Sequence, residues 1–208
     1  MTLYKKGSRG EIVRQIQKAL AGAGLRVMVD GFFGPITEEA VREFQKQKGL
    51  TPDGIVGPAT LALLIPARLK KSKRVINEII IHCTATPEGR ECTVTEIRRW
   101  HIQRGFNDIG YHYVIHLDGR VEEGRNIDIA GAHCTGHNAN SIGVVYVGGC
   151  AKDGKTPKDT RTEAQKVALA NLLIDLRKLY PRATIHGHRD FANKACPSFD
   201  ATREYRMF

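Results

Sequence analysis

The chain has 208 residues, of which 41% are hydrophobic and 26% are charged, so it is long enough for one large or two small globular domains. This composition excludes a wholly disordered chain, and no collagen, coiled-coil or mucin-like repeat runs through the sequence. No apolar run approaches the roughly 18–20 residues that cross a bilayer. The first residues lack the apolar segment of a secretory signal peptide, so we expect a protein made in the cytosol without an export route of its own.

The net charge of +10 predicts a polyanionic partner, which can be a nucleic acid, an anionic membrane or an acidic cell-wall polymer. The five cysteines are odd in number and widely spaced, in a chain large enough to build a core without disulfides. We therefore expect reduced thiols, one of them with a chemical role. They are Cys83, Cys92, Cys134, Cys150 and Cys196.

Residues 1–65 contain an internal repeat, because DGFFGPIT at 30–37 recurs as DGIVGPAT at 53–60. Asp-Gly predicts a tight turn, and Gly-Pro predicts a helix start. A first helix precedes both repeats, and residues 8–11 fit a capping box at its start. The predicted structure is a small all-α three-helix domain. Its apolar positions are Val13, Ile16, Leu20, Val41, Phe44, Leu61, Leu64 and Ile65.

This pattern of glycines, apolar positions and doubled DGxxG elements resembles the bacterial peptidoglycan-binding domain. The resemblance implies that the N-terminal domain binds the glycan or the stem peptide of the cell wall. Residues 66–76 follow as a basic linker, with the run RLKKSKR at 68–74. This run is interpreted either as a solvated connection or as a binding segment.

From residue 77 to 208 the patterns alternate between strands and helices, which predicts an α/β domain with a mixed central sheet flanked by helices. Capping boxes at 93–96 and 160–163 begin two helices, and Pro181 ends the second. The continuous Ile79, Ile80 and Ile81 predict a buried strand that ends in His82. Strands are expected at 75–81, 111–117, 120–123, 141–147 and 183–186.

Three residues have the side chains and positions for a zinc site, namely His82, His188 and Cys196. Three protein ligands leave the fourth tetrahedral position of zinc open, as in catalytic sites, whereas structural sites are usually closed by four. By residue type alone, eight histidines and five cysteines offer many such triples. His186, two residues before His188, is one alternative ligand.

The motifs IIIHCTAT, GYHYVIHLDG, GAHCTGHNANSIGV and HRDFANKACPSFD occur in this order and resemble the zinc N-acetylmuramoyl-L-alanine amidases. The fold of this family is shared with the peptidoglycan recognition proteins. The resemblance implies Zn²⁺ as the cofactor, with His82, His188 and Cys196 as ligands. It also implies catalytic roles for Tyr111 and Lys194, and a place for His133 in the substrate-binding groove.

The implied roles follow from side-chain chemistry. A lysine ammonium at Lys194 can stabilise an oxyanion, and Tyr111 can hydrogen-bond the attacking water or the same oxyanion. Tyrosine, with an ordinary pKa near 10, is a poor base at neutral pH, so the group that moves the proton stays open. Among the other candidates, His112 and His116 are expected in packing or surface positions, His101 on a helix face, and Cys83 in the core.

The resemblance implies a phage-type endolysin that hydrolyses the amide between N-acetylmuramic acid and L-alanine and lyses the host cell. It waits in the host cytoplasm until it is released to the cell wall. Peptidoglycan is the expected partner, anionic envelope polymers are further candidates, and we expect a monomer that binds no nucleic acid. Three alternatives remain: a non-catalytic recognition protein, a wall-recycling amidase and a nucleic-acid binder. Cys196, Tyr111 and the wall-binding module argue against the first two.

Overall fold

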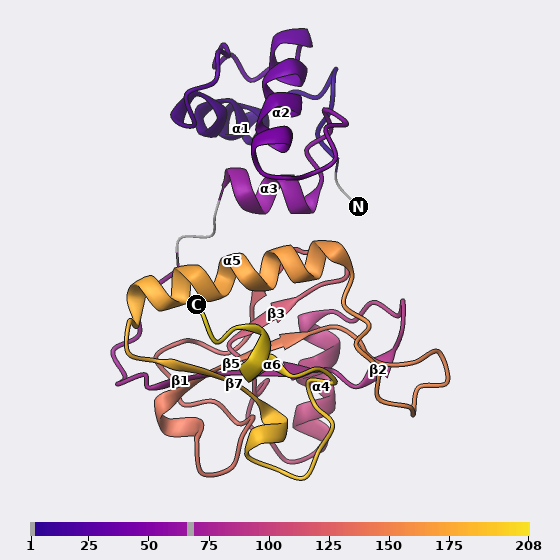
Figure 1. Ribbon diagram of the computed structural model, residues 1–208, viewed down its shortest axis with the longest axis vertical. Helices are drawn as coiled ribbons and strands as arrows, with labels where there is room; N and C mark the ends of the chain where they lie inside the picture. Colours follow the sequence, from indigo (N-terminus) through magenta and orange to yellow (C-terminus); the bar gives the residue numbers. More distant parts are fainter. Residues whose placement is uncertain (1–2, 66–68) are drawn as a thin grey trace. The chain divides into compact units, whose positions relative to one another are not determined.

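A computed structural model describes residues 3–65 and 69–208 of the chain, which divide into two compact units, Met1–Ala67 and Arg68–Phe208 (Figure 1). Residues 66–68, where the predicted linker begins, lie outside the described residues. Within the described parts, no helix has the length and apolar character needed to span a membrane.

The N-terminal unit contains the three predicted helices, α1(Glu11–Gly22), α2(Pro35–Gln47) and α3(Pro58–Leu64). Two of them begin at the proline of a Gly-Pro pair, as the repeat predicted. The core of this unit is apolar and includes most of the predicted positions. Its buried members are Val13, Ile16, Leu20, Phe33, Ala40, Val41, Phe44, Val56 and Leu64.

A buried glutamine closes each repeat of the N-terminal unit. The Gln17 side-chain amide donates to Asp30 Oδ1 and to the Thr37 hydroxyl, and its oxygen accepts from the Gly31 backbone N–H. In the second repeat Gln45 makes the equivalent bonds to Asp53 Oδ1, the Thr60 hydroxyl and the Gly54 N–H. Gly31 and Gly54 have φ of 79° and 74°, a region that favours glycine. The sequence repeat is therefore also a repeat of hydrogen bonds.

The start of α1 differs from the predicted capping box. The N-cap is Gly10, with φ of 119° and no side-chain cap, while the Ser8 hydroxyl accepts from the Lys5 N–H instead. The Gly10 carbonyl bonds to the Arg14 N–H, and the Gly10 N–H donates to the Gly31 carbonyl. The tertiary contact with the first DG turn has displaced the local cap.

The C-terminal unit is built on a five-stranded sheet in the order β4-β3-β5-β1-β7, which confirms the predicted mixed α/β fold. All neighbouring pairs are parallel except β3 and β4, which pair antiparallel on either side of the turn at Asp118 and Gly119. The strands are β1(Glu78–Cys83), β3(Tyr113–Ile115), β4(Val121–Glu123), β5(Ser141–Tyr146) and β7(Thr184–Gly187). A separate two-stranded sheet pairs β2(Thr86–Pro87) with β6(Gly149–Cys150).

Helices cover both faces of the five-stranded sheet (Figure 1). The long helix α5(Glu163–Leu179) packs on the face that carries Ile79, Ile81 and Cys83 of β1. Helix α4(Val94–Gln103) packs on the opposite face, against β3 and β5. Because side chains alternate along a strand, Ile80 and His82 point to the α4 face. The remaining helices are short: η1(Asn138–Asn140), η2(His188–Asp190) and α6(Ala201–Glu204).

One of the two predicted helix starts in this unit needs adjustment, and the other is confirmed. Helix α5 has its capping box at Thr162 and Gln165, two residues later than expected. The Thr160 hydroxyl accepts from the Gly149 N–H instead, which ties the segment before the helix to β6. Helix α4 is capped by the Thr93 hydroxyl, which accepts from the Glu96 N–H as predicted. Strand β1 starts at Glu78 rather than at Val75.

Much of the basic linker, predicted to be either a solvated connection or a binding segment, packs on the C-terminal unit. Ser72 is buried, its N–H donates to the Tyr180 hydroxyl and its own hydroxyl donates to the Ile127 carbonyl. The Arg74 guanidinium donates to the carbonyls of Ile127 and Ser141. Ser72 and Arg74 therefore belong to the C-terminal unit, because its carbonyl and hydroxyl groups are their hydrogen-bond partners.

Candidate metal centre and its surroundings

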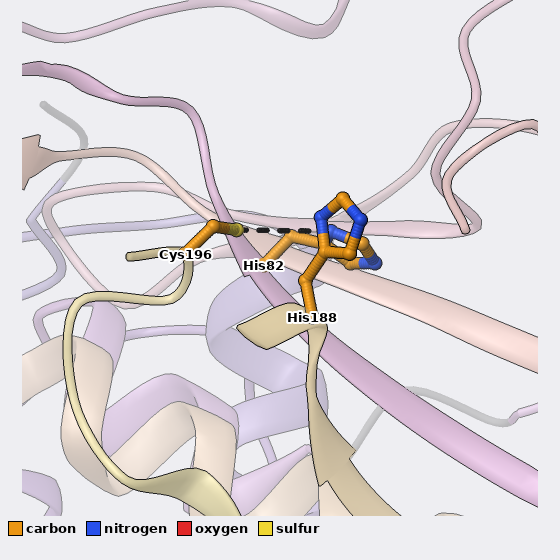
Figure 2. Close-up of side chains that lie close together, drawn as sticks. All are labelled: His82, His188 and Cys196. Atoms are coloured by element: carbon orange, nitrogen blue, oxygen red, sulfur yellow. Dashed lines mark hydrogen bonds between the residues drawn. The ribbon is translucent and has the colours of Figure 1, made fainter. Parts of the chain in front are cut away.

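The three predicted metal ligands meet at the carboxyl ends of two adjacent parallel strands. His82 lies near the end of β1, and His188 follows β7 directly, at the start of η2. The two strands pair in parallel with Ile81 opposite Gly187, so both histidines emerge at the same edge of the sheet. Cys196 reaches the same point from the loop after η2 (Figure 2).

The distances between these side chains suit a tetrahedral metal. One ligand atom from each of His82, His188 and Cys196 lies within 4.8 Å of the others, and Cys196 Sγ is 3.8 Å from His82 Nδ1 (Figure 2). Sulfur and nitrogen bound to one tetrahedral zinc are about 3.5 Å apart. Two imidazoles and one thiol are also ligands that zinc prefers. The donor set therefore fits a zinc ion with one open position.

The protonation of both histidines favours metal binding. Burial lowers the pKa of His82 well below its ordinary value, with a further contribution from the nearby His133. Burial also lowers the pKa of His188, and the Lys194 ammonium adds to this effect. Both rings are therefore neutral at neutral pH, and each offers a nitrogen lone pair to a cation.

The loop that carries Cys196 is tied to the rest of the unit on both sides. The Cys83 backbone N–H donates to Cys196 Sγ at 3.3 Å, and the Arg189 N–H donates to the Cys196 carbonyl at 2.7 Å. Just beyond, the Tyr146 hydroxyl donates to the Pro197 carbonyl. The neighbouring Cys83 thiol and burial raise the pKa of the Cys196 thiol, so a metal has to displace its proton on binding.

Tyr111 lies beside the ligands, at the point where the chain enters β3. Its ring centroid is 5.0 Å from that of His82 and 5.2 Å from that of His101. His101, on α4, accepts the Gly110 N–H at Nδ1 and so holds the residue before the tyrosine. Burial raises the pKa of the Tyr111 hydroxyl, which keeps it a protonated hydrogen-bond donor.

Lys194 is exposed and stands in the same loop as Cys196, two residues before it. Its positive charge lowers the pKa of both candidate histidine ligands, after burial for His188 and after burial and the two neighbouring histidines for His82. The structure thus brings an ammonium group to the solvent side of the cluster. This position suits a group that meets a substrate rather than one that supports the fold.

His133 also lies against the cluster, on its buried side. Only 8% of the residue is exposed, and its Nδ1 is 3.1 Å from Nε2 of His82. The backbone N–H groups of His133 and Cys134 both donate to Asn138 Oδ1, which fixes the turn that carries the ring. The resemblance implied a residue of the substrate groove; the role in substrate binding stays a prediction.

The remaining histidines have structural partners. His186 bonds to the Thr184 hydroxyl and packs on Phe191, so the alternative ligand lies apart from the cluster. His101 lies on helix α4, as expected, and His112 takes the packing alternative of its prediction. Both are buried, and burial lowers the pKa of each to about 4. Cys83 belongs to the core, as expected.

Several residues around the site escaped sequence reasoning. Gly131 and Gly143 flank the His133 ring, and Ser141 lies at its far nitrogen. Arg74 holds the loop beneath them through bonds to the Ile127 and Asn138 carbonyls. Gly131, Ser141 and Gly143 lie within the motif GAHCTGHNANSIGV, but their contacts with the His133 ring depend on the tertiary structure. No motif marked Arg74. Only the contact of the Cys83 N–H with Cys196 could be anticipated, because Cys83 directly follows the predicted ligand His82 in the sequence.

Two families match different parts of this chain. Residues 72–199 match the family described as N-acetylmuramoyl-L-alanine amidase, and residues 9–64 match the one described as putative peptidoglycan binding domain. The endolysin of Klebsiella phage KP32 is 44% identical over 138 residues, which are 66% of this chain and 91% of that protein. The endolysin of Escherichia phage T7 is 43% identical over 133 residues, 64% of this chain and 87% of that protein.

Solved structures show the same relationship. The N-acetylmuramoyl-L-alanine amidase LysC from Clostridium intestinale superposes with a TM-score of 0.54 at 28% identity, covering 63% of this chain and 82% of that one. Drosophila PGRP-LB superposes with a TM-score of 0.54 at 27% identity, covering 71% of this chain and 91% of that one. With the family match over most of the C-terminal unit, these findings show that the chain belongs to the N-acetylmuramoyl-L-alanine amidase family.

Proposed function

We propose that this protein is a zinc-dependent endolysin that cuts the amide bond between N-acetylmuramic acid and L-alanine in bacterial peptidoglycan. Membership of the amidase family supports the reaction. The observation that carries the zinc dependence is the cluster of His82, His188 and Cys196, whose ligand atoms lie within 4.8 Å of one another. Bound there, zinc would polarise the scissile carbonyl and activate the attacking water.

Lys194 and Tyr111 are proposed to act on the oxyanion that forms when the amide carbonyl is attacked. The Lys194 ammonium is exposed and close enough to lower the pKa of His188, so it can approach a substrate oxygen at the metal. A positive charge placed before the reaction stabilises developing negative charge without reorganising solvent. In this proposal Lys194 also supplies a proton to the leaving amine of L-alanine.

Tyr111 is proposed to donate a hydrogen bond rather than to accept a proton. Burial raises the pKa of its hydroxyl, so the phenolate that a general base requires is scarce at neutral pH. The ring is held between His82 and His101, at centroid distances of 5.0 and 5.2 Å. A protonated phenol in this place can orient the attacking water or stabilise the oxyanion.

The N-terminal unit is proposed to hold the enzyme on the wall. The match of residues 9–64 to the putative peptidoglycan binding domain supports this role. A tethered catalytic unit experiences a higher local concentration of substrate bonds. The net charge of +10 adds attraction to anionic envelope polymers, which salt weakens. We further propose that the protein acts as a monomer, binds no nucleic acid, and reaches the wall after release from the host cytoplasm.

The direct test measures free amino groups released from purified sacculi, with reducing sugars as a control for glycan cleavage. Amine release without reducing-sugar release is expected. Removal of metal by a chelator should abolish it, and stoichiometric Zn²⁺ should restore it. Unchanged amine release from a protein that elemental analysis shows to be free of metal would contradict the zinc dependence and leave the amidase reaction standing.

A further inference from the structure

The two ring nitrogens of His82 face different partners. Nδ1 points toward the thiol of Cys196, at 3.8 Å, and is the nitrogen on the ligand side of the ring (Figure 2). Nε2 faces the interior, where Nδ1 of His133 lies 3.1 Å away. A neutral imidazole carries one proton, so a lone pair on Nδ1 requires the proton on Nε2. The group that receives this proton in a hydrogen bond controls which nitrogen can bind a metal.

We propose that His133 is a positioning residue for the metal centre, which accepts the Nε2–H of His82 and thereby holds the Nδ1 lone pair toward His188 and Cys196. The inference deepens the proposed function, since it rests on His82 being a metal ligand. It gives His133 a role different from contact with substrate. Metal-bound histidines commonly donate their second N–H to a carboxylate, a carbonyl or water; here the partner is another imidazole.

The hydrogen bonds beyond His82 agree with one arrangement of protons. If His133 accepts at Nδ1, its own proton is on Nε2, and the Ser141 hydroxyl lies 3.3 Å from that nitrogen as an acceptor. A neutral imidazole carries a single N–H, so a ring that accepts at Nδ1 donates at Nε2. The chain from His82 through His133 to Ser141 therefore has each proton pointing away from the metal.

Two glycines form a slot that fits the His133 ring. A Cβ atom added to Gly131 would lie 2.3 Å from Cδ2 of His133, and one added to Gly143 would lie 2.5 Å from the same atom. Both distances are too short for any side chain larger than hydrogen. Gly143 is on β5 and pairs with Ile80, two residues before His82 in β1. The ring thus lies between a loop glycine and a glycine of β5, the strand that pairs with the one carrying His82.

The backbone of His133 is held as firmly as its ring. Its N–H donates to Asn138 Oδ1 at 2.8 Å, and the Asn138 carbonyl in turn accepts from the Arg74 guanidinium at 3.2 Å. Arg74 also donates to the Ser141 carbonyl at 3.2 Å. The acceptor, its loop and the serine at its far nitrogen are therefore parts of one hydrogen-bonded network, in which the His133 ring and Ser141 are buried. Such a network positions a neighbouring ligand, whereas a substrate contact needs an open surface.

The experiment compares Zn²⁺ affinity, measured by competition with a chromophoric chelator, in the full-length wild type, His133→Leu and His133→Asn. Leucine fills the slot without an acceptor, and the asparagine amide oxygen restores one near the place of Nδ1. We expect Zn²⁺ to bind about 10–100-fold more weakly to the leucine variant. The asparagine variant should recover most of this loss. His137→Leu, in the same loop, is the matched control and should bind as wild type.

A second readout is independent of turnover and of zinc affinity. Cobalt(II) in place of zinc reports on ligand geometry through its visible absorption, and His133→Leu should shift that spectrum while His133→Asn restores it. Folding of the leucine variant is judged by far-ultraviolet circular dichroism, and if it does not fold the asparagine variant is the test. A Zn²⁺ affinity within twofold of wild type and an unchanged cobalt spectrum support the acceptor role. Tenfold weaker Zn²⁺ binding overturns it.

The outcomes separate this inference from the function on which it rests. Wild type that binds no Zn²⁺ overturns the proposed metal centre itself. Wild type that binds Zn²⁺, together with a leucine variant of equal affinity and a raised KM on muropeptides, overturns the positioning role and makes His133 a substrate contact. Weaker Zn²⁺ binding in the leucine variant, with KM unchanged once zinc is saturating, supports it.

Discussion

Gln17 in the N-terminal unit and His133 in the C-terminal unit are both buried polar side chains, yet they stabilise different things. Gln17 bonds to the turn that follows its own helix, and Gln45 repeats the arrangement in the next turn. His133 instead bonds to His82 across the sheet. The glutamines fix backbone turns close to them in the sequence, whereas the histidine holds a reactive side chain assembled from distant segments. A buried polar hydrogen bond thus stabilises a backbone turn in the N-terminal unit and, in our proposal, positions a metal ligand in the C-terminal unit.

The largest effect should follow from removing a metal ligand. His188→Ala or Cys196→Ser takes one of three donors from the cluster, so bound zinc and amine release should both fall to background. Zinc is measured by elemental analysis and activity on purified sacculi. Cys92→Ala, which removes a buried sulfur from the α4 side of the sheet, is the control and should keep both. Full activity in the ligand variants would contradict the assignment of His188 and Cys196 as metal ligands.

Next in size are the two groups proposed to act on the oxyanion. Lys194→Ala and Tyr111→Phe should retain zinc and lower kcat by about 10²–10³-fold, since each removes one donor from the reacting centre. Lys155→Ala, at an exposed loop lysine, and Tyr113→Phe, on the opposite face of the sheet, are the matched controls. Wild-type kcat in both test variants would show that the mechanism is wrong even though the fold is right.

A smaller effect is expected from the glutamines, and it should be confined to stability. Gln17→Leu leaves the Gly31 N–H without its acceptor, and an unsatisfied buried polar group costs about 1–3 kcal/mol. Thermal unfolding of the N-terminal unit should shift down accordingly, while kcat on soluble muropeptides stays unchanged. Gln47→Leu is the control, because that exposed side chain bonds only to Glu43 among the described residues. Loss of activity on soluble muropeptides in Gln17→Leu would contradict the expectation that the C-terminal unit acts independently of the N-terminal unit.

The smallest effect should come from removing residues 1–67. The C-terminal unit forms its own core and contains the whole metal cluster, so activity on soluble muropeptides should be retained. Activity on intact walls should fall about tenfold, because tethering then no longer concentrates the catalytic unit. Binding to sacculi is measured by sedimentation beside the rate of amine release. Equal rates on walls with and without residues 1–67 would show that the N-terminal unit contributes nothing to wall attack.

Much of the fold could be predicted because its signals are local. The Gly-Pro pairs begin two helices, the three consecutive isoleucines lie in a central strand, and Pro181 follows the end of α5. The errors concern two helix caps and the linker. The Ser8 hydroxyl accepts from the Lys5 N–H, three residues away, instead of capping α1, and the Thr160 hydroxyl accepts from the Gly149 N–H of β6 instead of capping α5. The basic segment around Ser72 was predicted to be either a solvated connection or a binding segment, and the Ser72 hydroxyl has its acceptor on the C-terminal unit.

By itself, the sequence determined the two-part organisation, the repeat in the first part and the chemical types gathered for a metal, since turns, caps and apolar periods depend on neighbours along the chain. Tertiary structure alone decided that β1 and β7 lie side by side and so bring His82 to His188. It also decided that Gly131 and Gly143 leave room for His133 behind the ligand. These contacts join residues from separate strands and loops, and no local pattern records a distance across a sheet.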